Sequence, residues 1–294
     1  MKPVALVTGT SSGFGLLTAV ELARTCHQVF ATMRDPARAA PLLEAAARLG
    51  VEVTVLPLDV RDPGSIAACV AEVLHRAGRI DVLVNNAGIA IGGFFEDQSA
   101  AEIREQFETN VFGAMEVTRA VLPSMRAARS GKVITVSSFG GRMGTPGLGP
   151  YCATKFALEG FAESLRHELR ALGVQVALVE PGTYGTQAFF SNKRVARGAG
   201  ASADYAGRLE VAQAALYADL ERRQPDPREV ARAIGRLAAA RRVPLRTTVG
   251  RDARLGAFAQ WLLPAWLFER VVARRFAPPP APAAAAPQPA PQPD

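Results

Sequence analysis

The stretch YCATK places a tyrosine, Tyr151, four positions before a lysine, Lys155. On a helix this spacing puts the two side chains on the same face, one turn apart. A phenol and an ammonium so close together could exchange protons with a bound substrate. The same pair is also common on the surface of ordinary helices. The stretch alone therefore leaves open whether it is a catalytic pair or a solvent-exposed one.

A glycine-rich turn, TGTSSGFG, follows the first apolar run of the chain, and its glycines are Gly9, Gly13 and Gly15. Glycine lets the backbone turn tightly and approach a diphosphate, and the N-terminus of the next helix presents free N–H groups to the anion. The spacing G-x-x-x-G-x-G differs from the usual G-x-G-x-x-G, and a tight turn without a ligand is an alternative. A P-loop is excluded because no Gly-Lys-Ser/Thr follows. The position of the turn favours dinucleotide binding.

The end of the second apolar run, FATMRD, bears on the type of dinucleotide. An acidic residue directly after this strand would hold the adenosine ribose of NAD, but Met33 occupies that place and Arg34 follows it. A guanidinium there can bind a 2′-phosphate. The sequence therefore predicts NADP(H), with NAD(H) as the alternative if Asp35 holds the ribose. We expect Asp35 instead to cap the helix that begins at Pro36.

The elements that must position these residues alternate along the chain. Helical stretches separate short apolar runs, several of them apolar at nearly every position, as expected of strands covered on both faces. The candidate strands are PVALVTG, HQVFATM, VEVTVLPLD, IDVLVNN, GKVITVSS, VQVALVE and a weaker LRTTVG. Three helical stretches start with Asp-Pro, at Asp35, Asp62 and Asp226, where aspartate suits the N-cap and proline the first helical position. The pattern predicts an α/β fold, a Rossmann-type doubly wound parallel sheet of about seven strands with helices on both faces.

A single dinucleotide-binding and catalytic domain is predicted over residues 1–276. The strand rhythm stops over residues 183–225, which we interpret as an insertion that could close over a substrate. Its large apolar side chains, which could equally belong to the core, are Phe189, Phe190, Tyr205, Leu209 and Tyr217. Residues 251–276 form an apolar and basic extension, and residues 277–294, rich in Pro and Ala, are predicted to be a disordered tail.

Composition excludes several classes of function. The formal net charge is +7, but the basic residues are scattered and show no zinc spacing, RNA-binding signature or basic region with heptads, so we expect no nucleic-acid partner. Three widely spaced cysteines suggest neither a disulfide framework nor a metal site, and we expect no metal. The N-terminal MKPVALVTG enters a strand-like run at once and leaves no room for a signal peptide, so we expect a cytoplasmic protein.

The apolar stretch LGAFAQWLLPAWLFERVV lies near the C-terminus. It is interrupted by Pro264 and Glu269 and bounded by Arg254 and Arg274, so it does not form a continuous membrane span. The sequence favours an amphipathic segment packed on the domain or at a subunit contact over attachment to a membrane surface.

Several short motifs occur in a fixed order at successive predicted strand ends. Together they make the chain resemble the short-chain dehydrogenase/reductase family over about residues 3–250. The wording is most similar to the branch that contains 17β-hydroxysteroid and retinol dehydrogenases and their bacterial relatives. The motifs that carry the resemblance are TGTSSGFG, Asp59 after the third strand, NNAG at Asn85–Gly88, Asn110 in TNVFG, Ser138 in VSS, Tyr151 and Lys155 in YCATK, and PG at Pro181 and Gly182.

The resemblance implies that Tyr151 is the general acid/base in the interconversion of an alcohol and its ketone or aldehyde, with hydride transfer to or from nicotinamide. An isolated phenol has a pKa of about 10. The Lys155 ammonium and an oxidised nicotinamide are both expected to lower that pKa. Ser138 would hold the substrate oxygen, with Ser137 as the alternative. Asn110 would anchor a water that connects Lys155 to solvent.

The same resemblance implies a cofactor site along the strand ends. The glycine-rich turn would wrap the diphosphate, and Arg34 would meet the 2′-phosphate. The full predicted set is Thr8, Gly9, Ser11, Ser12, Gly13, Phe14, Gly15, Arg34, Asp59, Val60, Asn86, Ala87, Gly88, Tyr151, Lys155, Pro181, Gly182 and Thr186.

The expected substrate is a small lipophilic alcohol or ketone, because the insertion is rich in apolar side chains. With NADP(H) as cofactor, reduction is the expected physiological direction. The family's usual assembly implies a homodimer or homotetramer, for which the helical stretch FALEGFAESLRHELRAL is apolar enough. The alternative function is a non-catalytic dinucleotide sensor or scaffold on the same fold.

Overall fold

The structure, a computed structural model, describes residues 2–185, 193–205 and 207–275. The predicted cofactor residue Thr186 lies outside these ranges. So do Phe189, Phe190 and the predicted tail at 277–294, and the side chain of Tyr217 is likewise not described. The predictions made for these residues stay predictions.

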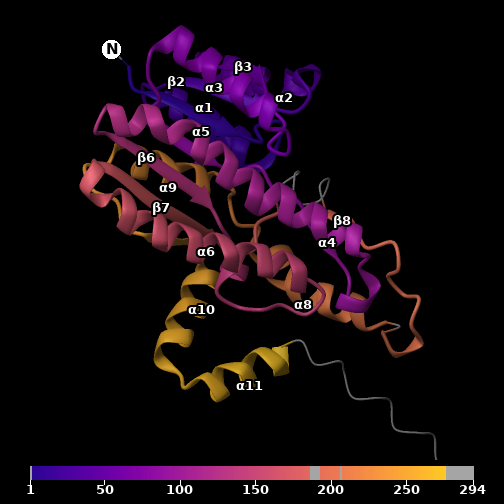
Figure 1. The fold of residues 1–294 in the computed structure, drawn as a ribbon. Coiled ribbons are helices and arrows are strands. Elements are labelled where there is room, and N and C mark those ends of the chain that lie inside the picture. Colours follow the sequence, from indigo (N-terminus) through magenta and orange to yellow (C-terminus); the bar gives the residue numbers. More distant parts are fainter. Residues whose placement is uncertain (1, 186–192, 206, 276–294) are drawn as a thin grey trace, which may run out of the picture.

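A seven-stranded sheet runs through the molecule in the order β3-β2-β1-β4-β6-β7-β9, and all its pairings are parallel (Figure 1). Each predicted apolar run forms one strand, so the predicted fold class is confirmed. The strands are β1 (Val4–Thr8), β2 (Gln28–Met33), β3 (Thr54–Pro57), β4 (Val82–Asn85), β6 (Gly131–Val136), β7 (Val174–Pro181) and β9 (Arg246–Val249).

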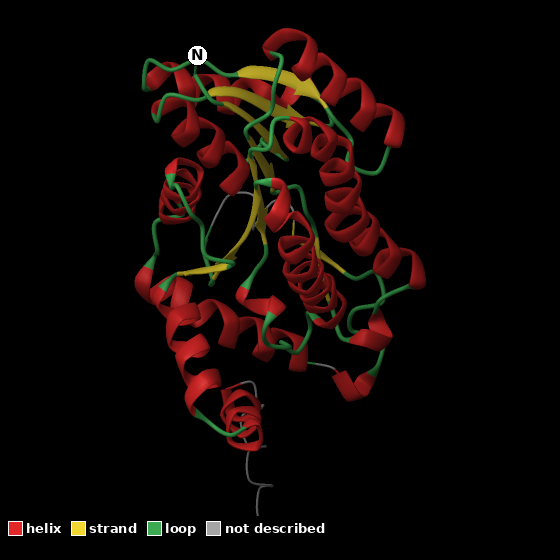
Figure 2. Ribbon diagram, turned by 60° about the vertical axis from the view of Figure 1, so that its left-hand side comes forward, coloured by secondary structure: helices red, strands yellow, loops and turns green. Residues whose placement is uncertain are grey.

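Helices cover both faces of this sheet, as Figure 2 shows. Successive side chains of β1 alternate between two cores, with Ala5 and Val7 in one and Val4 and Leu6 in the other. Because both faces are covered, the strand is apolar throughout instead of alternating with polar residues. The first core includes α1 (Gly13–Arg24), α2 (Ala40–Arg48) and α9 (Arg228–Ala239), and the second includes α3 (Pro63–Ala77), α5 (Gly113–Ala127) and α6 (Gly149–Leu169).

Two of the three Asp-Pro pairs begin a helix at the predicted residue, and at the third the helix begins one residue later. The side chains of Asp35 and Asp62 each accept a backbone N–H two residues on, at 3.0 and 2.8 Å. Asp35 opens a 3-10 turn that leads into α2, and Asp62 caps α3 directly. At Asp226 the prediction is wrong by one residue, because α9 begins at Arg228 and Pro227 occupies the N-cap position.

The predicted insertion contains a strand that the sequence did not indicate. β8 (Lys193–Val195) pairs in parallel with β5 (Ala90–Gly92), which follows β4. Three residues are too few to show a period, so neither strand could be read from the pattern. The insertion continues into α8 (Arg208–Arg223), as its helical pattern predicted. Its Tyr205 ring stacks on Phe94, with centroids 4.6 Å apart, which holds the insertion against the loop after β5.

The remaining helices lie beyond the sheet. α4 (Ala100–Phe107) leads through a π-helical turn, Glu108–Phe112, into α5. The C-terminal extension forms α10 (Arg251–Leu262) and α11 (Ala265–Arg275), which project from one end of the domain in Figure 1. Among the helices that the structure describes, none combines the length and the apolar character needed to cross a membrane.

Candidate active site

A cavity of about 970 Å³ lies at the carboxyl ends of the parallel strands. Ligands of doubly wound α/β folds bind at this edge, because the strand-to-helix loops gather there. The cavity is at the upper end of the usual range for small-molecule sites. It extends from the glycine-rich turn after β1 to α6, α10 and α11, so it offers room for a dinucleotide with a second molecule beside it.

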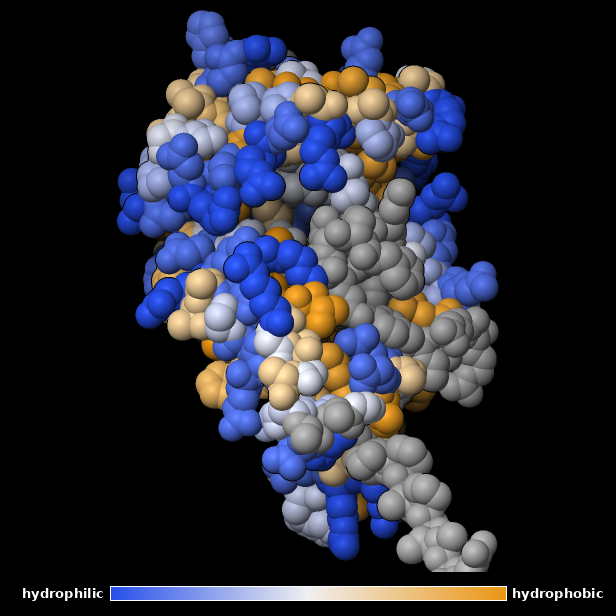
Figure 3. All heavy atoms as spheres, turned by 90° about the vertical axis from the view of Figure 1, so that its right-hand side faces the viewer, coloured by the Kyte–Doolittle hydropathy of each residue, from blue (hydrophilic) through white to orange (hydrophobic). Residues whose placement is uncertain are grey.

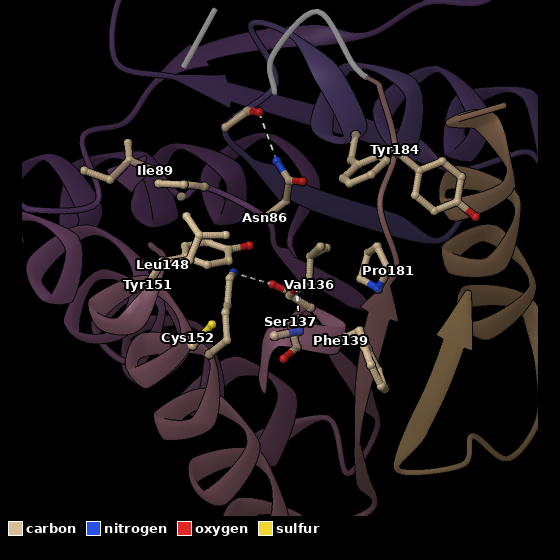
Figure 4. Close-up of a pocket in the computed structure, with 18 of the residues that line it drawn as sticks. Asn86, Ile89, Val136, Ser137, Phe139, Leu148, Tyr151, Cys152, Pro181 and Tyr184 are labelled. Atoms are coloured by element: carbon tan, nitrogen blue, oxygen red, sulfur yellow. Dashed lines mark hydrogen bonds between the residues drawn. The ribbon is translucent and has the colours of Figure 1, made fainter. Parts of the chain in front are cut away.

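Tyr151 and Lys155 both line this cavity from the first turns of α6. The Lys155 side chain is only 6% exposed, and its Nζ lies 5.7 Å from the centroid of the Tyr151 ring. Nζ donates a hydrogen bond to the carbonyl oxygen of Val136, at the end of β6, over 3.0 Å. Tyr151 and Val136 face the same space in Figure 4. The buried lysine excludes the alternative of a solvent-exposed pair.

Burial dominates the acid–base properties of this pair. It raises the pKa of Tyr151 to about 12, although a hydrogen bond with Ser138 acts in the opposite direction. It lowers the pKa of Lys155 to about 8, although the charge of Glu159 acts to raise it. The expected lowering of the phenol pKa by Lys155 is therefore not seen in the chain alone. Removal from water disfavours the charged form of each group.

A largely buried set of charges lies close to Lys155 along α6. Glu159, one turn further along α6, accepts a hydrogen bond from Arg246 Nε at 2.8 Å. The same guanidinium lies 3.6 Å from Glu180, whose carboxylate is fully buried and also accepts from the Thr248 hydroxyl at 2.7 Å. Burial raises the pKa of Glu159. The negative charge that supports the Lys155 ammonium thus comes from within the core of the domain.

The two serines at the end of β6 have different surroundings. Ser138 acts on the Tyr151 hydroxyl, whose pKa it lowers, and its Oγ accepts the N–H of Gly140 at 3.0 Å. Ser137 is buried, and its Oγ makes no hydrogen bond within the described part of the chain. Both line the cavity. The geometry favours Ser138 as the hydroxyl that would act with Tyr151 on one substrate atom.

Asn110 is not among the residues that line the cavity. It lies in the π-helical turn before α5, a kind of turn that is frequent at functional sites. Its Oδ1 accepts the N–H of Ile89 at 2.8 Å, and its Nδ2 donates to the Ile89 carbonyl at 2.9 Å and to the Thr154 hydroxyl at 3.0 Å. The side chain thus ties the loop after β4 to α6. Its predicted role in holding a water stays a prediction.

Hydrogen bonds from polar side chains hold the backbone of the glycine-rich turn in its conformation. Asn86 Nδ2 donates to the carbonyl oxygens of Thr8 and Gly9, at 2.9 and 3.0 Å, and the Thr8 hydroxyl accepts the N–H of Asn86 at 3.0 Å. A Cβ at Gly15 would lie 2.2 Å from the Gly9 carbonyl oxygen, so only glycine fits there. These contacts show why a motif residue of the turn need not touch a ligand. Thr8 and Gly15 hold the turn in shape.

The start of α1 suits a diphosphate. The helix has no side-chain cap at Ser12 and no acidic residue in its first turn. Its first N–H groups therefore lack a side-chain partner and can bind an anion, which the helix dipole also favours. Gly9, Ser11, Ser12 and Phe14 line the cavity at this point. These residues fit the diphosphate of a dinucleotide.

Three arginines line the cavity where β2 and β3 end: Arg34, Arg38 and Arg61. The sequence indicated only the first. Arg38 follows it by four positions, and Arg61 lies two residues after Asp59, with which it forms an ion pair at 3.4 Å. Proximity to Arg34 and Asp59 along the chain was the signal that could have identified the other two. Asp35 also borders this region, but one of its oxygens caps the helix as expected.

Tyr184, which the sequence analysis did not single out, packs between the glycine-rich turn and α9. Its ring packs edge-on against Phe14 of the glycine-rich turn, with centroids 5.7 Å apart. Its hydroxyl donates to Glu229 of α9 at 2.9 Å, and burial raises its pKa.

The far wall of the cavity is apolar and is formed by Met143, Leu148, Leu255, Ala259, Phe268, Val271 and Val272.

The structure brings most of the predicted site residues to one cavity. Those that line it are Gly9, Ser11, Ser12, Phe14, Arg34, Asp59, Val60, Asn86, Ala87, Gly88, Ser138, Tyr151, Lys155, Pro181 and Gly182. Those that are described but do not line it are Thr8, Gly13, Gly15 and Asn110. Thr186 lies outside the described residues.

Comparisons with known proteins all point to one family of oxidoreductases. The family model for short chain dehydrogenase matches residues 3–197. An uncharacterised oxidoreductase of Bacillus subtilis, YusZ, is 41% identical over 93% of this chain and 98% of its own. A 3-ketodihydrosphingosine reductase of Bacteroides thetaiotaomicron is 39% identical over 85% of this chain and 89% of its own. Bovine retinol dehydrogenase 8 is 44% identical, but over 62% of this chain and 59% of its own.

Solved structures share the fold. A short-chain dehydrogenase from Streptomyces avermitilis superposes with a TM-score of 0.75 at 36% identity, over 92% of this chain and 98% of its own. An actinorhodin polyketide ketoreductase, solved with NADPH, superposes with a TM-score of 0.73 at 31% identity, over 84% of this chain and 95% of its own.

The buried amine predicts an unusual pH dependence of stability. Its folded-state pKa of about 8 lies below the ordinary 10.5, so the unfolded chain binds more protons between these values. The free energy of unfolding should therefore rise as the pH increases from 8 towards 10, below the titration of Tyr151. Lys155→Met should abolish this rise and stabilise the cofactor-free protein at pH 7 by on the order of 1–2 kcal/mol. Urea unfolding across this pH range measures both effects.

Tyr151→Phe is the matched control, because it keeps the buried amine and should keep the rise. A Lys155→Met protein that shows the same pH dependence as the unsubstituted chain would contradict this interpretation.

Proposed function

Because the chain belongs to the short-chain dehydrogenase family, we propose that it is an NADP(H)-dependent oxidoreductase. In this proposal it interconverts a lipophilic primary or secondary alcohol and its aldehyde or ketone. The observation that carries it is the meeting of Ser138, Tyr151 and Lys155 in a cavity whose far wall is apolar. A family resemblance alone would leave the chemistry open.

Ser138 and Tyr151 would hold the substrate oxygen between two hydroxyl groups. With a pKa of about 12, the phenol is protonated at neutral pH and suited to give a proton to that oxygen as a ketone is reduced. Lys155, with a pKa of about 8, is mostly charged at pH 7 and would stabilise the phenolate that remains. When bound, the nicotinamide would supply the hydride for reduction or accept it in oxidation. Proton return to Tyr151 would follow through Lys155, held in place by Val136.

The apolar wall supports a lipophilic substrate. Leu148, Phe268 and Val272 line the same cavity as Tyr151 and offer no charge. Burial of such a substrate would be driven by the hydrophobic effect. Two of the relatives are named for 3-ketodihydrosphingosine and for retinol, which accords with a long apolar alcohol or ketone.

The arginines at the ends of β2 and β3 support NADP(H) over NAD(H). Arg34 and Arg38 offer guanidinium groups for a 2′-phosphate. Asp35, the alternative ribose ligand, already accepts a backbone N–H as a helix cap. The NADPH in the solved structure of the polyketide ketoreductase is in line with this preference.

We further propose a homodimer or homotetramer in the cytoplasm. Phe112 and Phe156, close to α5 and on α6, are about half exposed, at 49% and 47%, and could pack across a two-fold axis. The cysteines are unpaired, which suits a reducing compartment.

A non-catalytic dinucleotide sensor is the second candidate. Such a protein would need the glycine-rich turn and the arginines, but it would not need a phenol and a buried amine beside an apolar wall. Turnover separates the two candidates.

Tyr151→Phe should reduce NADPH-dependent reduction of lipophilic ketones by roughly 10²–10⁴-fold, because it removes the proton donor. The NADPH affinity should change little, which fluorescence titration can check. Loss of NADPH absorbance against a panel of long-chain and steroid-like ketones measures the rate. Binding of NADPH without turnover of any member by the unsubstituted chain would favour the sensor, and an unimpaired variant would refute the assigned role of Tyr151.

Arg34→Ala should weaken the apparent affinity for NADPH by roughly tenfold or more, because a charge-assisted hydrogen bond to the 2′-phosphate is lost. The affinity for NADH, which lacks that phosphate, should stay the same. Titration of both cofactors gives the ratio, and Arg48→Ala, an exposed arginine on α2, serves as the control. Equal losses for NADPH and NADH would contradict the NADP(H) assignment.

A further inference from the structure

The helices α10 and α11 expose large apolar side chains to solvent. Six of them are between 50% and 78% exposed, and we refer to this set as the hairpin face: Leu255, Phe258, Trp261, Leu262, Trp266 and Val271. Leu255, Phe258 and Leu262 follow the spacing of one helical stripe. The rings of Phe258 and Trp261 lie near each other, with centroids 6.0 Å apart. A concentration of exposed apolar groups on a short segment indicates an interaction surface.

The helix pair α10–α11, which we call the hairpin, is anchored to the active site through α10. Asp252 Oδ2 accepts the N–H of Thr183 at 2.7 Å, next to the Pro-Gly pair after β7. The Phe139 ring, directly after Ser138, packs so closely on Gly256 that a Cβ there would lie 2.4 Å from it. Gln260 donates to the carbonyl oxygen of Arg142 at 2.9 Å. The hairpin is therefore fixed to the domain, yet no other described part of the chain buries these six residues.

The apolar wall of the cavity continues onto this exposed face. Leu255 and Val271 line the cavity, yet they are 62% and 50% exposed. Phe268 and Val272, deeper in, are only partly exposed. A continuous apolar path therefore leads from the surface of the hairpin towards Tyr151.

Positive charge surrounds the hairpin face. Arg251, Arg270 and Arg274 are exposed on the two helices, and no hydrogen bond or ion pair with another described residue engages their side chains. The acidic residues of the same helices are Asp252, which is taken up by Thr183, and Glu269. Figure 3 shows the projecting end at the bottom of the view, with hydrophilic side chains at its tip.

We propose that the hairpin face docks onto an anionic lipid bilayer, so that the cavity opens towards the lipid. Tryptophan, other large apolar side chains and arginines are the combination that favours the interface between headgroups and acyl chains. A second copy of the chain is the weaker occupant, because a two-fold contact would bring arginines together with only Glu269 to offset them. The sequence alone favoured packing on the domain or at a subunit contact, and the exposure of all six side chains shows that packing on the domain leaves this surface uncovered. The inference does not depend on the proposed chemistry.

The two tryptophans of the chain, Trp261 and Trp266, both lie on the hairpin face. Intrinsic tryptophan fluorescence of the unsubstituted protein therefore reports on this surface alone. With vesicles of phosphatidylcholine and phosphatidylserine, the emission should shift to shorter wavelength and be quenched by brominated acyl chains. Vesicles of phosphatidylcholine alone should give a much smaller effect, and high salt should weaken the binding because it screens the arginines.

A charge variant tests the electrostatic part. The combined change Arg251→Gln, Arg270→Gln and Arg274→Gln should lower partitioning onto the anionic vesicles by roughly a hundredfold, because each arginine near such a surface contributes about a factor of five. The matched control Arg48→Gln, Arg126→Gln and Arg170→Gln removes the same charge from exposed positions elsewhere. It should bind almost as well as the unsubstituted protein. Equal losses for the two triple variants would overturn the proposal.

A variant that lacks both tryptophans tests the contribution of apolar side chains to membrane binding. Trp261→Ser with Trp266→Ser should abolish co-sedimentation with the anionic vesicles, whereas Phe95→Ser, at a site that is 71% exposed but distant in sequence, should not. Unshifted tryptophan emission in the presence of anionic vesicles would also refute the proposal. Light scattering without lipid gives a second test. If the unsubstituted protein is an oligomer and the double tryptophan variant is a monomer, a second copy of the chain covers the hairpin face and the proposal is refuted.

Discussion

A buried amine held beside a partly buried phenol is the constraint on which the rest of the site depends. The Lys155 ammonium is removed from water and retains one backbone acceptor, the carbonyl oxygen of Val136. That carbonyl lies at the end of β6, so the position of the amine is fixed by the central sheet. The phenol of Tyr151 comes from the same helix one turn earlier. Burial shifts both pKa values away from the charged forms, and the sheet holds the pair in that state.

The topology explains why one edge of the sheet offers two chemically different regions. Parallel strands deliver all their loops to the same edge. The loops after β1, β2 and β3 supply backbone N–H groups and arginines, which suit phosphate groups. The elements after β6 and β7, together with the C-terminal helices, supply the phenol, the amine and an apolar wall. A charged molecule and a lipophilic one can therefore lie end to end, with Tyr184 and Phe14 in contact between the two regions.

Patterns spread over many residues could be predicted from the sequence, and contacts between distant segments could not. The seven strands were visible because each is a run of apolar residues covered on both faces. Strands β5 and β8 were not, because three residues show no period. Motif residues such as Thr8 and Asn110 were identified, but only the structure shows that their side chains bond to neighbouring segments of the protein and do not line the cavity. The burial that raises the pKa of Tyr151 in the chain alone could not be predicted from residue spacing.

The pKa of the Lys155 amine, followed by carbon NMR of the lysine Cε atoms in the cofactor-free protein, tests the central claim most directly. The account predicts a value of about 8 in the native chain. It also predicts a still lower value in Glu159→Gln, because that change removes the buried negative charge that supports the ammonium. A Lys155 pKa near the ordinary 10.5, unchanged by the Glu159 substitution, would contradict it.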